Sequence, residues 1–194
     1  DIQFKAKEDP NGVNHQVTQF SVGGNFVVDG QGDVEFQASE ADIQGSAVIN
    51  SGGDLTMSTV TDASESTEVS TEGNVTTTTT VHSQAERGVT FTTGEHLVTN
   101  SGGDTTITAG QLSADGAVQM DALGDLNILA GHSETTTEST TKTTGWVRVP
   151  STGTVGLGGV GHSTLKTETS TATSKSTGAV QSAISSGAGM QLSA

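Results

Sequence analysis

A short motif recurs along the first two thirds of the chain: Gly, any residue, then an apolar, a polar and an apolar residue. Its copies begin at Gly24, Gly32, Gly45, Gly53, Gly73, Gly94, Gly103, Gly116 and Gly124. Alternating apolar and polar residues are typical of a β-strand with one buried and one exposed face. The leading Gly suits a tight turn, and we expect it to adopt a positive φ there.

The copies are regularly spaced. Gly24 and Gly45 are 21 residues apart, and so are Gly32 and Gly53, while the two members of each pair start eight residues apart. A 21-residue unit with two short strands and room for a third cannot bury its apolar face alone, but stacked units can. The spacing therefore predicts an all-β fold, a right-handed parallel β-helix (β-solenoid) with coils of about 21 residues.

One interval departs from this spacing. "NSGGD" occurs at 50–54 and again at 100–104, so the interval is 50 residues rather than 42, the length of two coils. We interpret the interval as two coils with a surplus, and we place the surplus in the polar stretch "VTTTTTVHSQAER" at 75–87, as a bulge from one corner.

The same pattern divides the chain. An N-terminal segment at 1–21 precedes the coils at 22–130. Residues 131–178 are Thr/Ser-rich, lack apolar residues in register, and predict a β-hairpin-like excursion outside the β-helix. Strand-like spacing resumes at 179–194 with Ile184, Met190 and Leu192, so we expect a truncated coil there and a fragment of a longer protein.

Composition limits the class of partner. Only 30% of the residues are hydrophobic and the net charge is −15, which would be typical of disorder without the regular spacing. The absence of Cys excludes a disulfide scaffold. Seven basic against 22 acidic residues argue against nucleic acid and against anionic membrane surfaces.

The recurring Gly-Asp pairs are the first candidate site residues. They are Gly32 and Asp33, Gly53 and Asp54, Gly103 and Asp104, and Gly124 and Asp125. Because Asp caps turns through its own side chain, we interpret these pairs as structural turns rather than as catalytic carboxylates. Calcium binding at the acidic turns remains an open alternative.

The remaining candidates are isolated. The five histidines lack metal-ligand spacing, and we expect His96 to be a hydrogen-bonded histidine that points inward. Trp146, the one Trp, predicts either a contact surface or an anchor that holds the excursion on the solenoid. The Thr runs at 76–80 and 135–141 suit outward Thr ladders or sugar attachment. We expect no catalytic residue, no cofactor and no resident metal.

Two stretches resemble a known family. "SGGDLTMS" at 51–58 and "GDLNILAGHSETTTESTTKTTG" at 124–145 are similar to the haemagglutinin repeats of two-partner-secreted bacterial exoproteins. These include filamentous haemagglutinins, haemolysin-like adhesins and the toxin-delivery proteins of contact-dependent growth inhibition (CDI). The likeness is closest over 22–145, and 179–194 resembles the unit "SxIxAGGNLxLxA" of the same repeats.

The resemblance implies a function. It implies a structural and interaction segment of a filament, secreted to the surface of a Gram-negative bacterium, that serves adhesion or cell-contact-dependent toxin delivery, without catalysis. The implied partners are the outer-membrane transporter, through a region not in this chain, and a target-cell receptor or outer membrane. We expect a monomer.

Two other classes of protein remain as alternatives. A trimeric β-helical spike of a phage or secretion system also uses "GGD" strands, although with a repeat near eight residues. A polysaccharide-acting β-helix enzyme is the third class, and it is disfavoured because six of the seven basic residues lie outside the repeat strands.

Overall fold

The computed structural model describes residues 1–11, 13–149 and 162–194, which form strands and turns and contain no helix. The all-β prediction is confirmed. Most of the strands belong to three parallel sheets of five strands each. The first sheet contains β1 (Ile2–Phe4), β6 (Val34–Gln37), β9 (Leu55–Ser58), β14 (Thr105–Thr108) and β17 (Leu126–Leu129). The second contains β4 (Thr18–Val22), β7 (Ser39–Ile43), β12 (Thr90–Thr93), β15 (Gln111–Ala114) and β20 (Ala183–Ser186). The third contains β5 (Phe26–Gly30), β8 (Ala47–Ser51), β13 (Leu97–Ser101), β16 (Ala117–Ala122) and β21 (Gly189–Ser193).

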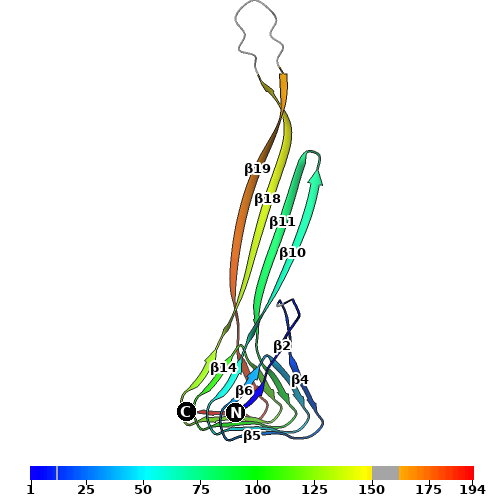
Figure 1. Ribbon diagram of the computed structural model, residues 1–194. Helices are drawn as coiled ribbons and strands as arrows, with labels where there is room; N and C mark the ends of the chain where they lie inside the picture. Colours follow the sequence, from blue (N-terminus) through cyan, green and yellow to red (C-terminus); the bar gives the residue numbers. More distant parts are fainter. Residues whose placement is uncertain (12, 150–161) are drawn as a thin grey trace, which may run out of the picture. The chain divides into compact units, whose positions relative to one another are not determined.

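The chain visits the three sheets in a fixed cyclic order (Figure 1). It passes from β4 in the second sheet to β5 in the third and β6 in the first, and β7, β8 and β9 follow in the same order. We call one passage through the three sheets a round. Successive rounds pair in parallel, strand on strand, so each sheet grows by one strand a round.

A single hydrophobic core is lined by all three sheets. Phe36 in the first sheet, Phe91 in the second and Ile49 in the third are fully buried and belong to one cluster. The rings of Phe36 and Phe91 meet edge to face with their centroids 5.2 Å apart. Burying side chains of this size contributes about 1.5–3 kcal/mol each, which gives a polar chain the apolar interior that its composition seemed unable to supply.

The register corrects our interpretation of the 50-residue interval. Leu55 pairs directly with Thr105, and Ala47 pairs directly with Leu97, so these residues lie in neighbouring rounds. The interval is therefore one round, not two, with 29 residues more than the 21-residue step. The additional residues are a hairpin of two long strands, β10 (Val60–Glu72) and β11 (Val75–Arg87), of which the predicted bulge at 75–87 is only the second strand.

Hairpins occur on alternate rounds. β2 (Lys7–Glu8) and β3 (His15–Gln16) follow β1, the β10–β11 hairpin follows β9, and β18 (Gly131–Val149) and β19 (His162–Val180) follow β17. In the rounds between them, the first sheet leads to the second through one residue in the left-handed region, Ala38 (φ 42°) or Ala109 (φ 49°). These two corners are 71 residues apart, as are Phe26 and Leu97, which both pair with Ala47. The repeating element is thus a pair of rounds.

The chain divides into two compact units. The repeat unit comprises 1–63, 84–134 and 177–194 and holds the three parallel sheets. The hairpin unit comprises 64–83 and 135–176, and its four strands are ordered β10-β11-β18-β19. In terms of the predicted segments, 1–21 supplies β1 and β4 to the sheets, 131–178 corresponds to β18 and β19, and 179–194 supplies β20 and β21.

Candidate functional surfaces

The Asp residues of the Gly-Asp pairs form a ladder from round to round. The backbone N–H of Asp54 donates to Oδ1 of Asp33 at 3.0 Å, and that of Asp104 donates to Oδ1 of Asp54 at 2.9 Å. Asp125 and Asp104 repeat the bond at 2.8 Å, and Asp1 begins the ladder by accepting from Asp33 at 3.2 Å. Each carboxylate therefore caps a backbone donor of the next round, which is a turn-stabilising role.

The Gly before each Asp is required by that ladder. A Cβ added to Gly103 would overlap the Asp54 carboxylate, and Gly32, Gly53 and Gly124 face the carboxylate of the preceding round in the same way. Close approach, rather than backbone conformation, is therefore the reason for Gly at these positions.

Our expectation of a positive φ at the motif glycines is wrong in general. Among the described glycines, only Gly73 (φ 61°) and Gly189 (φ 150°) have one. Gly73 is a motif Gly and lies in the turn between β10 and β11, where a tight hairpin needs this conformation.

His96 does not point inward as predicted. It is exposed, and Leu97 fills the buried position in register with Ala47. Gly94, Glu95 and His96 make this turn one residue longer than the corresponding turn before Ala47, which shifts the alternation by one. The His96 ring still has a structural role, because Nδ1 accepts a hydrogen bond from the Ala117 N–H at 2.9 Å.

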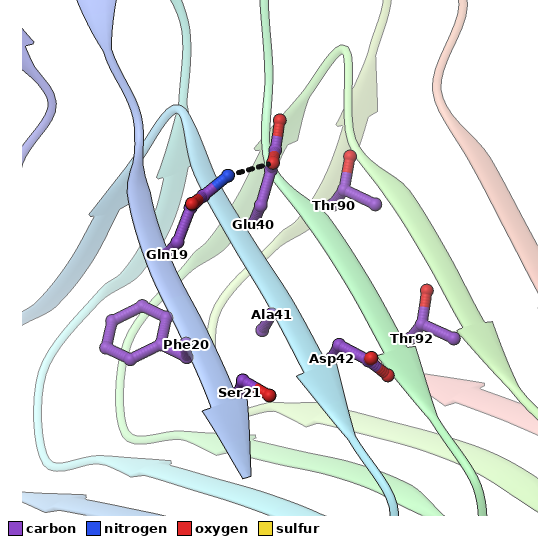
Figure 2. A pocket seen from close by; sticks show the side chains of 8 residues that line it. All are labelled: Gln19, Phe20, Ser21, Glu40, Ala41, Asp42, Thr90 and Thr92. Carbon is purple, nitrogen blue, oxygen red and sulfur yellow. Dashed lines mark hydrogen bonds between the residues drawn. The ribbon is translucent and has the colours of Figure 1, made fainter.

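The outer face of the second sheet carries a polar groove of about 440 Å³ (Figure 2). Its polar side chains are Gln19, Ser21, Glu40, Asp42, Thr90 and Thr92, from β4, β7 and β12. Gln19 donates from Nε2 to Glu40 at 3.0 Å. The groove offers hydroxyl and carboxylate oxygens, so it could hydrogen-bond a polar ligand. It holds two carboxylates on one strand, fewer than the six oxygens that Ca²⁺ takes.

A paired network lies beside this groove. Asp62 accepts from the backbone N–H of His15 at 2.8 Å and lies 3.1 Å from the His15 ring, while Arg87 contacts both Asp62 at 3.8 Å and Glu40 at 3.4 Å. These contacts hold the β2–β3 hairpin and the first residues of β10 against β7. Because the charges of Arg87 are shared between two carboxylates, we interpret the network as structural.

The hairpin unit has no core. None of its described side chains is buried, and its strands are joined across the sheet by hydroxyl contacts of 3.2–3.5 Å. These contacts are Thr67–Thr80, Thr71–Thr76, Thr77–Thr141, Thr140–Thr171 and Thr144–Thr167. Cross-strand Thr pairs contribute about 0.2–1 kcal/mol each, which agrees with the predicted Thr ladders.

The β18–β19 hairpin is longer than the β10–β11 hairpin (Figure 1). The shared part ends where Thr144 donates its N–H to Asn74 O at 3.0 Å and contacts Thr167. Between Thr144 and Thr167 lie 22 residues, 145–166, which we call the extension. The register gives the same number independently. From Gln19 to Thr90 is 71 residues and from Thr90 to Ala183 is 93, a difference of 22. The two-round repeat accounts for everything except the extension.

The extension contains Trp146, whose side chain is 73% exposed. Such exposure favours the contact-surface interpretation over a packed anchor. Val147 (45%) and Leu165 (57%) are exposed with it. Trp146 and Val147 also line a groove of about 160 Å³ together with Thr143, Gly145, Lys166 and Glu168. Part of the extension, 150–161, lies outside the described residues.

An ion pair borders Trp146. Lys166 donates from Nζ to Glu168 at 2.7 Å. This hydrogen bond, and secondarily the opposite charge, raises the pKa of Lys166 and lowers the pKa of Glu168. Both side chains remain charged and exposed at neutral pH, so they can still contact a partner.

Other expected sites are not assembled in the described part of the chain. There, no group of three or more His, Asp or Glu side chains is placed to hold a metal ion. The described residues likewise include no helix with the length and apolarity to cross a membrane. The side chain of His162 lies outside the described side chains.

Comparison with known proteins gives one match. The family model described as "Hemagglutinin repeat" matches residues 3–75 and 64–194. No curated protein and no solved structure matches the chain.

Proposed function

Because the chain belongs to the haemagglutinin-repeat family, we propose that it is a structural and interaction segment of a secreted bacterial surface filament, without catalysis. The family is typical of secreted and cell-surface bacterial proteins. The filament would be displayed on a Gram-negative bacterium and exported by the outer-membrane transporter of a two-partner system, through a region outside this chain.

We further propose that the three sheets are the faces of a right-handed parallel β-helix. The cyclic order of the strands, the single core lined by all three sheets and the ladder of Asp carboxylates support this interpretation. Parallel crossovers are right-handed in nearly all proteins. Rounds built from one chain also speak against the trimeric spike, whose chains are intertwined.

The observation that carries the functional proposal is the extension. A repeat scaffold explains every strand of the two-round period but not residues 145–166, which are absent from the equivalent β10–β11 hairpin. Exposed apolar side chains gathered in such an element mark a contact surface. Adhesion requires only this contact, whereas toxin delivery requires further domains, so adhesion is the function we favour.

A variant without the extension tests this function. Residues 145–166 are replaced by Gly-Asn, the two-residue turn that joins β10 to β11, so that Thr144 and Thr167 flank a tight turn. We expect the circular dichroism spectrum and melting temperature to match the parent, while binding to Gram-negative cells falls to background. Val69→Asp is the matched control, since Val69 is 62% exposed on β10 of the same sheet. Equal binding by the parent and the shortened variant would overturn the proposal.

A further inference from the structure

The extension differs in charge from the rest of the chain. It contains two basic residues, Arg148 and Lys166, and no acidic residue, so its formal charge is +2. The whole chain carries −15, which leaves −17 on the remainder. A charge argument that excludes anionic surfaces for the chain as a whole therefore does not apply to this segment.

The extension also stands clear of the acidic residues along its own strand. β18 continues for five residues beyond Thr144, about 17 Å at the usual rise per residue. Screening at physiological salt reduces the effect of charges beyond about 8 Å. Glu168, the acidic residue that lines the Trp146 groove, is neutralised by its bond to Lys166.

Apolar side chains lie on both faces of the extension. Trp146 and Val147 are consecutive strand residues, so they point to opposite faces. Thr140 contacts Thr171, and Thr144 contacts Thr167, so continuing this antiparallel ladder by two residues brings Leu165 opposite Trp146. A protein partner buries one face of a ribbon, whereas an apolar medium surrounds both. The two-faced distribution therefore favours a lipid environment.

We propose that the extension binds a phospholipid surface, with Trp146, Leu165 and Val147 inserted at the boundary between headgroups and acyl chains and Lys166 near anionic headgroups. Trp is suited to this boundary because its ring is apolar and its N–H is polar. A two-stranded ribbon leaves backbone groups unpaired along both edges, which the hydrocarbon core does not tolerate. Binding is therefore interfacial and does not span the bilayer.

This inference rests on the proposed function and names the partner of the same surface. The chain has one Trp and no Tyr, so the intrinsic emission of the intact protein reports on Trp146. With vesicles of phosphatidylcholine mixed with phosphatidylglycerol, we expect the emission to shift to the blue and the protein to float with the vesicles. Vesicles of phosphatidylcholine alone should bind more weakly, because the charge attraction is absent.

Single substitutions separate the two contributions. Lys166→Gln should lower the affinity for the mixed vesicles roughly fivefold, the effect of one basic residue near an anionic surface. Leu165→Asp should abolish the blue shift, while Val69→Asp should leave it unchanged. Absence of a shift with every vesicle, while the parent still binds cells through the extension, would overturn the lipid proposal in favour of a protein receptor. Loss of extension-dependent cell binding itself would instead overturn the proposed function.

Discussion

At the scale of single residues, the repeat is held by contacts between equivalent residues of neighbouring rounds. Asp54 caps the backbone of Asp104, and Gly103 leaves the space that the Asp54 carboxylate occupies. The Gly-Asp pair is thus one device, in which the Asp of one round determines the residue required in the next. A substitution at either position should be felt through the other.

Gly103→Ala tests this coupling. The added Cβ overlaps the Asp54 carboxylate, so we expect a loss of about 1–3 kcal/mol in the free energy of unfolding. In the Asp54→Ala background the same change should cost less, because the obstructing carboxylate is gone. Gly24→Ala is the control, since nothing lies within 4 Å of its Cβ position. Additive effects in denaturant titrations would contradict the proposed coupling.

Thr99 is an uneconomical core residue. It is fully buried between Ile49 and Met120, and its hydroxyl is the one buried side-chain polar atom without a partner among the described residues. Thr99→Val keeps the shape and removes the unpaired group, so we expect stabilisation by about 1–3 kcal/mol. Thr105→Val should destabilise instead, because it breaks the 2.8 Å contact with Ser101. Thermal melts of both variants distinguish these outcomes.

The Lys166–Glu168 pair gives a pH-dependent signal. Because the hydrogen bond from Lys166 lowers the pKa of Glu168, the pair is fully formed above the ordinary Glu pKa and is lost as pH falls through the lower folded value. Both side chains are exposed, so carboxyl chemical shifts are a better readout than stability. In Lys166→Gln the Glu168 midpoint should return to the ordinary range. An unchanged midpoint would mean that the pair does not persist in solution.

At the scale of elements, the chain alternates between two ways of leaving the first sheet. One round uses a hairpin, and the next uses a single residue with positive φ, Ala38 or Ala109. Both Ala side chains are buried, and a small residue is tolerated in the left-handed region where a β-branched one is not. The corner residue therefore determines whether the next round begins at once.

Ala109→Val tests the corner. A β-branched residue at φ 49° is strained in addition to overfilling a buried position, so we expect a loss of about 2 kcal/mol or more. Ala109→Gly should change the stability by less than about 1 kcal/mol, since relief of strain offsets the loss of one buried methyl group. Chemical denaturation compares the two, and equal losses would show that φ is unimportant here.

The strands of the repeat unit could be predicted from the sequence, but the hairpin strands could not. Leu55 and Met57 alternate with polar residues because one face is buried. The strands at 64–72 and 135–144 are exposed on both faces, so nothing in them selects a period. The slip at His96 came from one additional turn residue. Trp146 stood out by its rarity, but the boundaries of the extension required the register.

At the scale of the whole molecule, one chain builds both the repeated scaffold and one exception to the repeat. The 71-residue period accounts for paired rounds, and the 22-residue extension exceeds it. Local pairing of each round with the previous one keeps contacts close in sequence, except where a hairpin intervenes. Such a chain can fold round by round as it is exported, which agrees with a secreted filament.

The central claim is that rounds of one chain stack directly, with the hairpins left out of the stack. The chain has no Cys, so a single engineered pair is unambiguous. Asn50 and Asn100 are register partners, and Asn100 donates to Asn50 at 2.8 Å. Neighbouring parallel strands lie about 4.8 Å apart, within the range that a disulfide bridges.

The most direct measurement is therefore oxidation of the Asn50→Cys/Asn100→Cys variant, followed by mass spectrometry and a non-reducing gel. Asn50→Cys/Asp121→Cys is the control, because β13 lies between these two positions. Our account predicts a disulfide within one chain for the first pair and none for the second. A bridge between chains, or no bridge in the first pair, would contradict it.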